Sequence, residues 1–168
     1  PHELSGGMRQ RAMIALALAC SPKLLLADEP TTALDATVQI QILLLLRQLQ
    51  RELGMSIIFV THDVGVATEI ADELAVMYAG KIVEIGDVAD VIKKPAHPYT
   101  QGLLSSTVNS GSKGKRLEVI GGSPPDMSKL FKGCAFSPRC KKVLDQCWHQ
   151  QPAPETLSTD QIASCFNI

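Results

Sequence analysis

The sequence lacks the long apolar stretch that a membrane-spanning helix requires, and it carries no recognisable secretory signal. Its longest uninterrupted apolar run, Ala12 to Cys20, is far shorter than the roughly 20 residues that cross a bilayer. An excess of basic charge is missing too: the net charge is −1 at pH 7, so composition gives no reason to expect a nucleic-acid partner. These absences predict a soluble, intracellular protein that can dock on a membrane protein.

The remaining composition is that of an ordinary globular protein, with 45% hydrophobic and 20% charged residues among 168. That length suits one domain, or one domain with an appendage. The chain starts at Pro1 rather than at a methionine, and its first residues already belong to a motif. We therefore expect a fragment of a longer protein, because a parallel sheet needs more strands than this sequence offers.

An aliphatic run that ends in two adjacent carboxylates organises the first half of the chain. The segment Leu24–Ala27 predicts a short strand of a parallel sheet that is buried on both faces. Asp28 and Glu29 follow at its carboxyl end, where open α/β sheets bind ligands. Asp28 could hold a Mg²⁺ ion that bridges nucleotide phosphates, and Glu29 could orient or deprotonate the attacking water. Taken alone, Asp-Glu-Pro after a strand is more often an ordinary turn.

The segment Leu4–Met8 predicts an anion site at the start of a helix. Ser5 is a good N-cap, and Gly6 and Gly7 would leave backbone N–H groups open at the helix N-terminus. A phosphate suits such a site, although a plain helix cap is the commoner meaning of Ser-Gly-Gly alone. Cys20 lies in the apolar run that follows, and we expect it to be a buried, inert thiol.

Periodicity predicts the elements that follow. A helix over Ala36–Leu53 has apolar residues at three-to-four spacing, with Asp35 as its possible cap and Gly54 as its stop. A second buried strand, Ser56–Val60, ends near His62, and a lone histidine there is more often structural. Beside the carboxylates of the first strand, it becomes a candidate phosphate sensor. A helix over 64–71, a hairpin over 74–85 and a helix over 86–92 follow.

The order of these segments resembles the nucleotide-binding subunit of ABC transporters from Pro1 to about Gly86. The segments are LSGGM at 4–8, LLLADEP at 24–30, TTALD at 31–35 and VTHD at 60–63. The resemblance implies an α/β fold, a partial P-loop NTPase (ABC ATPase) domain that uses ATP and Mg²⁺. It also implies these roles: Ser5, Gly6 and Gly7 belong to the signature, Asp28 is the Walker B aspartate that holds Mg²⁺, Glu29 is the catalytic glutamate, Asp35 closes the D-loop, and His62 is the switch histidine.

The sequence departs from the family's pattern at three places. Met8 stands where glutamine is common in the signature, and Thr32 stands where serine is common in the D-loop. The larger departure is that the chain contains no G-x-x-x-x-G-K-[ST] motif and no glutamine loop. Both lie upstream of the signature in this family, so a break at Pro1 explains their loss. We therefore expect this chain alone to be inactive.

From Pro95 onward the sequence resembles the peptide-importer branch of the family, the oligopeptide and dipeptide permease ATPases. The segments that carry this resemblance are PAHPYT at 95–100, IGGSPP at 120–125 and GCAFSPRC at 133–140. We expect the C-terminal part of the ATPase domain over 1–94 and a small cysteine-rich extension over 95–168. The positions of His97 and Tyr99 favour packing groups at a domain junction over catalytic ones.

Four of the five cysteines crowd into the last part of the chain with the spacing C-x5-C-x6-C-x17-C: Cys134, Cys140, Cys147 and Cys165. In a reducing cytosol such a cluster more often binds metal than forms disulfides. The spacing differs from the C-x2-C pairs of common zinc ribbons, but it does not separate Zn²⁺ from an iron–sulfur cluster. The resemblance implies a [4Fe–4S] cluster, with zinc and unliganded thiols as alternatives.

The resemblance implies the ATP-hydrolysing motor subunit of an ABC importer for di- or oligopeptides, peripheral to the cytoplasmic face of the membrane. Its partners would be a second ATPase subunit packed head to tail (the same or a different chain), transmembrane permease subunits and, indirectly, an extracytoplasmic peptide-binding protein. The first alternative is a soluble non-transport ABC ATPase, against which the tail and the absence of a basic face argue. The second is a non-catalytic metal-binding regulatory module, against which the intact Asp28, Glu29 and His62 argue.

Overall fold

The computed structural model describes the chain except for residues 1, 108–118, 129–130 and 159–160. The chain divides into two compact units, Pro1–Ile70 and Ala71–Ile168. The boundary predicted near Pro95 lies inside the second unit. It separates two stretches of sequence that resemble different parts of the family, not two compact units, and it stays a prediction. Within the described residues, none of the helices combines the length and the apolar character needed to span a bilayer.

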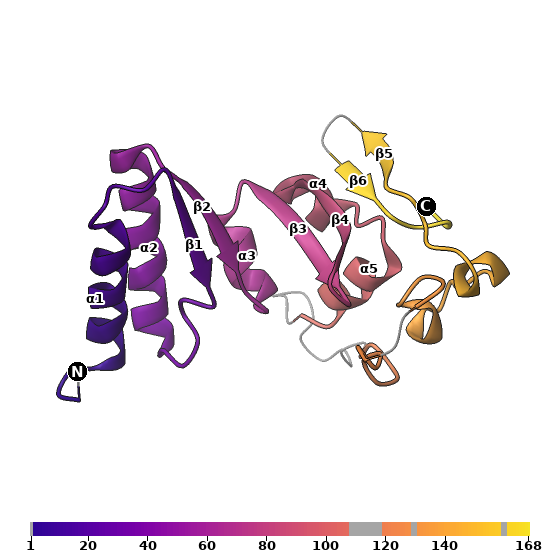
Figure 1. The fold of residues 1–168 in the computed structure, drawn as a ribbon, viewed down its shortest axis with the longest axis horizontal. Helices are drawn as coiled ribbons and strands as arrows, with labels where there is room; N and C mark the ends of the chain where they lie inside the picture. Colours follow the sequence, from indigo (N-terminus) through magenta and orange to yellow (C-terminus); the bar gives the residue numbers. More distant parts are fainter. Residues whose placement is uncertain (1, 108–118, 129–130, 159–160) are drawn as a thin grey trace. The chain divides into compact units, whose positions relative to one another are not determined.

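The first unit contains a strand–helix–strand arrangement with two parallel strands (Figure 1). Its elements are α1 (Gly6–Leu18), β1 (Leu24–Asp28), α2 (Ala36–Leu53), β2 (Ser56–Val60) and α3 (Val64–Ile70). Asp28 lies opposite Val60 in the parallel register, so both strands end at the same edge of the sheet. The crossover through α2 is the long connection that parallel strands need.

Helix α2 has the bounds that its sequence predicts. The Asp35 side chain accepts a hydrogen bond from the backbone N–H of Val38 at 3.0 Å, which satisfies one of the free donors of the first turn. Gly54 ends the helix in the left-handed conformation at φ 61°. Local capping signals therefore fix both ends of α2.

Helix α1 and helix α2 lie side by side and share one apolar core with the sheet (Figure 1). The buried members of that core are Ile14, Leu25, Ile42, Leu46, Met55 and Ile70. On β1, Leu25 is buried whereas Leu24 and Leu26 are 47% and 69% exposed. The prediction that the two strands are buried on both faces is therefore wrong for the described structure, because the core covers only the face that carries Leu25. Ile58 and Val60 of β2 are exposed in the same way.

Cys20 is exposed, so the prediction of a buried thiol is wrong as well. It lies beyond α1, which ends at Leu18. The chain turns there because Ser21 adopts a positive φ of 49° and Pro22 disfavours helix at the residue before it.

The second unit is built on a four-stranded antiparallel sheet in the order β3-β4-β6-β5. Its elements are β3 (Glu73–Tyr78), β4 (Lys81–Asp87), α4 (Val88–Lys93), α5 (Pro98–Ser105), two 3₁₀ turns (Ser137–Arg139 and Asp145–Trp148), β5 (Glu155–Ser158) and β6 (Gln161–Ala163). The predicted hairpin is confirmed: Ala79 and Gly80 join β3 to β4 with φ of 49° and 75°, the positive values that tight hairpin turns require.

A buried carboxylate joins three segments of this unit. Glu84 of β4 is 1% exposed and accepts hydrogen bonds from the backbone N–H groups of Ala96 and His97, at 2.8 and 2.9 Å. It also accepts from Nε2 of Gln161 in β6 at 2.8 Å. Because a buried charge needs such partners, Glu84 fixes the chain that leads into α5 against the sheet.

Candidate functional site

The carboxyl ends of β1 and β2 bring two of the predicted site residues together. Asp28 is the last residue of β1, and Glu29 follows it with a positive φ of 44°. The backbone N–H of Glu29 donates to the carbonyl of Val60 at 2.9 Å, so the turn is tied to the neighbouring strand. A non-glycine residue in this conformation is uncommon and such strain gathers at functional sites.

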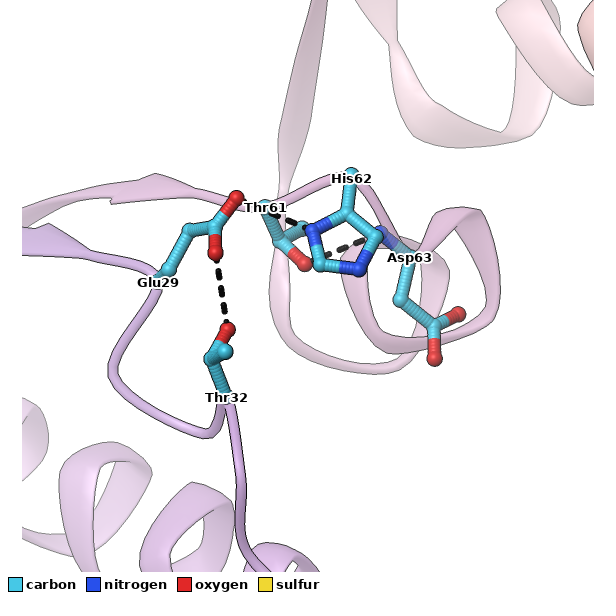
Figure 2. A network of polar contacts seen from close by, with 5 residues as sticks. All are labelled: Glu29, Thr32, Thr61, His62 and Asp63. Atoms are coloured by element: carbon cyan, nitrogen blue, oxygen red, sulfur yellow. Dashed lines mark hydrogen bonds and ion pairs between the residues drawn. The ribbon is translucent and has the colours of Figure 1, made fainter.

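Both carboxylate oxygens of Glu29 accept hydrogen bonds, as Figure 2 shows. Nδ1 of His62 lies 2.9 Å from Oε1, and Oγ1 of Thr32 donates to Oε2 at 2.8 Å. The bond from His62 and then the bond from Thr32 hold the pKa of Glu29 below its usual value. Since an ionised carboxylate only accepts, Nδ1 of His62 carries the proton in this pair. The side chains of His62 and Glu29 are 75% and 43% exposed, which leaves them open to a ligand.

The loop that carries His62 is itself fixed on both sides of the histidine. The backbone N–H of Asp63 donates to Oγ1 of Thr61 at 3.0 Å (Figure 2). Oδ1 of Asp63 accepts from the backbone N–H of Val66 at 3.2 Å, at the start of α3. His62 is therefore presented by a short, internally bonded turn directly after β2.

We expect the substitution Thr32→Val to raise the pKa of Glu29. The carboxylate would lose one of the two donors that stabilise its charged form, while the side chain keeps its shape. A ¹³C NMR titration of the Glu29 carboxyl measures the change. Thr32→Ser is the matched control, because it keeps the hydroxyl and should leave the pKa near that of the parent. An unchanged pKa in the valine variant would contradict the hydrogen bond in solution.

The signature residues form the first turn of α1. The Ser5 side chain accepts from the backbone N–H of Met8 at 3.3 Å, so Ser5 is the N-cap that the sequence predicts. A Cβ on Gly7 would come within 2.6 Å of Cγ1 of Val38. Glycine is thus required for close packing against α2, in addition to leaving N–H groups open. Within the described residues no hydrogen bond or ion pair joins Ser5 to Glu29.

The four clustered cysteines line one cavity of about 10 Å³ together with Phe136 and Phe166. None of them forms a disulfide. Burial, and to a smaller extent the neighbouring thiols, raise the pKa of Cys140 and of Cys165. Thiols with a raised pKa stay protonated at neutral pH unless a cation stabilises the thiolate. Once ionised, cysteine sulfur is a preferred ligand of both iron–sulfur clusters and zinc.

The described residues do not confirm a metal site at this cavity. In the described part of the chain, no three His, Cys, Asp or Glu side chains gather closely enough to hold one ion. The predicted metal ligands Asp28 and the four cysteines are therefore not confirmed as an ion site. The cavity volume of about 10 Å³ is the room of roughly one water molecule. This volume does not distinguish a zinc ion from an iron–sulfur cluster, so both stay predictions.

Sequence reasoning missed two contacts in these sites. In the sequence, Thr32 stands out only as a departure from the common serine. The structure shows that its hydroxyl, three residues after Glu29, reaches the Glu29 carboxylate. His97 packs near Phe136 and caps α5, in keeping with the predicted packing role, but it also lines the thiol cavity. Burial lowers the pKa of His97 to about 4, so its ring is neutral at pH 7.

Two family models match the chain. Residues 1–32 match the model described as "ABC transporter", and residues 83–147 match "Oligopeptide/dipeptide transporter, C-terminal region". The oligopeptide transport ATP-binding protein AppD of Bacillus subtilis is 50% identical over 99% of this chain and 51% of its own length. The OppD protein of Salmonella typhimurium, with the same description, is 51% identical over 99% of this chain and 49% of its own. The chain thus spans about half the length of these curated relatives.

A solved structure supports the fold. The cbiO1 protein of Clostridium perfringens, described as part of an ABC transporter complex, superposes with a TM-score of 0.52 at 38% identity. The match covers 55% of this chain and 37% of that one. It confirms the predicted α/β fold as part of an ABC ATPase domain. The chain therefore belongs to the ABC transporter ATP-binding family, and its residues 83–147 belong to the C-terminal region of the oligopeptide/dipeptide transporters.

Proposed function

We propose that the complete protein is the ATP-hydrolysing motor subunit of an ABC importer for di- or oligopeptides. The observation that carries this proposal is the pair of Glu29 and His62, 2.9 Å apart at the carboxyl edge of the parallel strands. An acidic residue beside a histidine at such an edge suits a bound nucleotide and an attacking water. The printed names of the relatives, oligopeptide transport ATP-binding proteins, support the substrate class.

Each residue of the edge has a separate task in this proposal. Asp28 would hold the Mg²⁺ ion of ATP, and that ion supplies charge neutralisation on the phosphates when bound. Glu29 would orient or deprotonate the attacking water: each of its oxygens accepts one hydrogen bond and keeps a further lone pair for the water. His62 would sense the γ-phosphate while it holds Glu29 in place.

The start of α1 would serve a second ATPase subunit. Ser5, Gly6 and Gly7 present open N–H groups that suit a phosphate, and none of them is hydrogen bonded to the described residues of the Glu29 edge. A head-to-tail dimer would therefore set this turn against ATP bound by the partner. Asp35, which caps α2, would end the D-loop between the two sites.

The assembly would place the chain at the cytoplasmic face of a membrane. Its partners would be the second ATPase subunit and transmembrane permease subunits, with an extracytoplasmic peptide-binding protein acting indirectly. Residues 1–94 would form the ATPase part and residues 95–168 the importer-specific extension. The match of residues 83–147 to a peptide-transporter region supports the importer-specific role of the second part.

Turnover assays test the proposal. We expect the 168-residue chain alone to release no phosphate from ATP, because it contains no G-x-x-x-x-G-K-[ST] cradle for the β- and γ-phosphates. The complete protein, assembled with its permease subunits in vesicles, should hydrolyse ATP and take up peptides. Hydrolysis by the complete protein in solution, with no peptide uptake in vesicles, would favour a soluble ABC ATPase. Hydrolysis by the chain alone would contradict the assigned roles.

We also propose that Cys134, Cys140, Cys147 and Cys165 hold one [4Fe–4S] cluster. The single cavity that all four cysteines line, together with the apolar rings of Phe136 and Phe166, supports this proposal. The segment has few large apolar residues, and a metal centre would offset its small core. Anaerobic purification with iron and sulfide analysis should give about four irons per chain; stoichiometric zinc without iron would contradict the cluster.

A further inference from the structure

Thr32 holds Glu29 through both its backbone and its side chain. The backbone N–H of Thr32 donates to the carbonyl oxygen of Glu29 at 3.1 Å, which closes the turn after β1. Its Oγ1 donates to Oε2 of the Glu29 carboxylate at 2.8 Å, as Figure 2 shows. One exposed threonine therefore fixes both the main chain and the carboxylate of the same glutamate.

The two oxygens of the Glu29 carboxylate are bound from different loops. Thr32, in the loop between β1 and α2, donates to Oε2, whereas Nδ1 of His62, in the loop after β2, lies 2.9 Å from Oε1. A partly exposed glutamate without such partners would sample several side-chain rotamers. Donors on both oxygens restrict the orientation of the carboxylate, and a proton acceptor must be oriented before it can react.

The two donors to Glu29 differ in their response to pH. The hydroxyl of Thr32 keeps its hydrogen throughout the physiological range, whereas histidine is the side chain whose charge changes most readily in that range. The other titratable groups of these two loops are Asp28, Asp35 and Asp63. Thr32 is thus the donor whose bond to Glu29 does not depend on its own protonation.

We propose that Thr32 is a positioning residue for ATP hydrolysis: its hydroxyl holds the Glu29 carboxylate so that a free lone pair faces the attacking water. This inference rests on the proposed function and adds a residue to it. As the water oxygen bonds to the γ-phosphorus and the bond to ADP breaks, the water proton passes to Glu29. Thr32 exchanges no atom in this step, and it acts only through Glu29.

The substitution Thr32→Val in the complete protein tests the role by steady-state phosphate release. Valine keeps the branched shape but removes the donor, so we expect kcat to fall roughly tenfold, at the low end for a hydrogen bond to a charged group, with an unchanged KM for ATP. The acidic limb of the kcat–pH profile should move to higher pH, because the loss of this donor raises the pKa of Glu29. Thr32→Ser keeps the hydroxyl and should restore the parent values. Thr68→Val is the matched control, since the Thr68 hydroxyl donates to the carbonyl of Gly65 in α3.

A double variant separates this role from the proposed function. If Thr32 acts through Glu29, adding Thr32→Val to Glu29→Gln should leave the residual rate unchanged, whereas a further loss would overturn the inference. Parent kinetics in Thr32→Val, or an equal loss in the serine variant, would overturn it and leave Glu29 as the base. Parent hydrolysis by Glu29→Gln would overturn the proposed function as well. If the valine variant fails to fold, Thr32→Ala takes its place in every comparison.

Discussion

The substitution Glu29→Gln in the complete protein should leave ATP binding intact and slow hydrolysis roughly 10²- to 10⁴-fold, the usual contribution of a general base. The amide keeps the shape of the side chain and can still accept from Thr32. It carries no charge and cannot take a proton from water. Steady-state phosphate release, together with a nucleotide-binding measurement on the same protein, separates the lost step from lost binding.

Glu52→Gln is the matched control for that experiment. Glu52 lies near the end of α2 and accepts a hydrogen bond from Nε2 of Gln48, one turn earlier, rather than from any group at the sheet edge. Its amide variant should hydrolyse ATP at the parent rate. If the Glu29→Gln variant also hydrolyses ATP at the parent rate, Glu29 is not the general base, and the residues at the carboxyl ends of β1 and β2 do not have the proposed catalytic role.

The pairing of Glu29 with His62 could be predicted from the sequence because it needs only two local facts. Glu29 directly follows the first strand, and His62 lies two residues after the end of the second. The helix between the strands is long enough for a parallel crossover. The bounds of α2 can also be predicted from the sequence, because Asp35 is a typical N-cap and Gly54 a typical helix stop. The hairpin at Ala79-Gly80 follows from turn chemistry in the same way.

The features that could not be predicted depend on contacts between distant segments. The exposure of Leu24 and Leu26 is decided by which face of the sheet the helices cover, and an all-apolar strand does not encode that choice. Strand β6 pairs with β4 across more than 70 residues, and its link through Gln161 and Glu84 leaves no local pattern. The prediction for Cys20 is wrong because the apolar composition indicates a longer helix than Pro22 allows.

The place of His97 beside the cysteines could not be predicted for a similar reason. Its capping of α5 is a local feature, visible in the order histidine, proline, tyrosine. Its place beside the cysteines arises from chain segments that follow it by 37 residues or more, from Cys134 to Cys165. A sequence can therefore show that such a histidine is well placed for packing without showing which cavity it lines.

The substitution Cys140→Ser should abolish the cluster, reducing iron from about four per chain to almost none. Serine is close to cysteine in size but removes one of the four sulfur atoms that line the cavity. Because the surrounding segment has a small apolar core, we also expect lower stability of residues 133–166 in the anaerobic protein. Iron analysis, visible absorption and hydrogen exchange measure these changes.

Cys20→Ser is the control for the cluster, because Cys20 is exposed, belongs to the other compact unit and lies outside the cavity lining. Its iron content should equal that of the parent. Equal iron in the Cys140 and Cys20 variants would remove Cys140 from the ligand set. If the anaerobic parent holds neither iron nor zinc, the proposed metal centre is wrong. Cys140 and Cys165, whose pKa values are raised by burial, would then be protonated thiols that only pack against their neighbours. The C-terminal extension would in that case be a metal-free appendage.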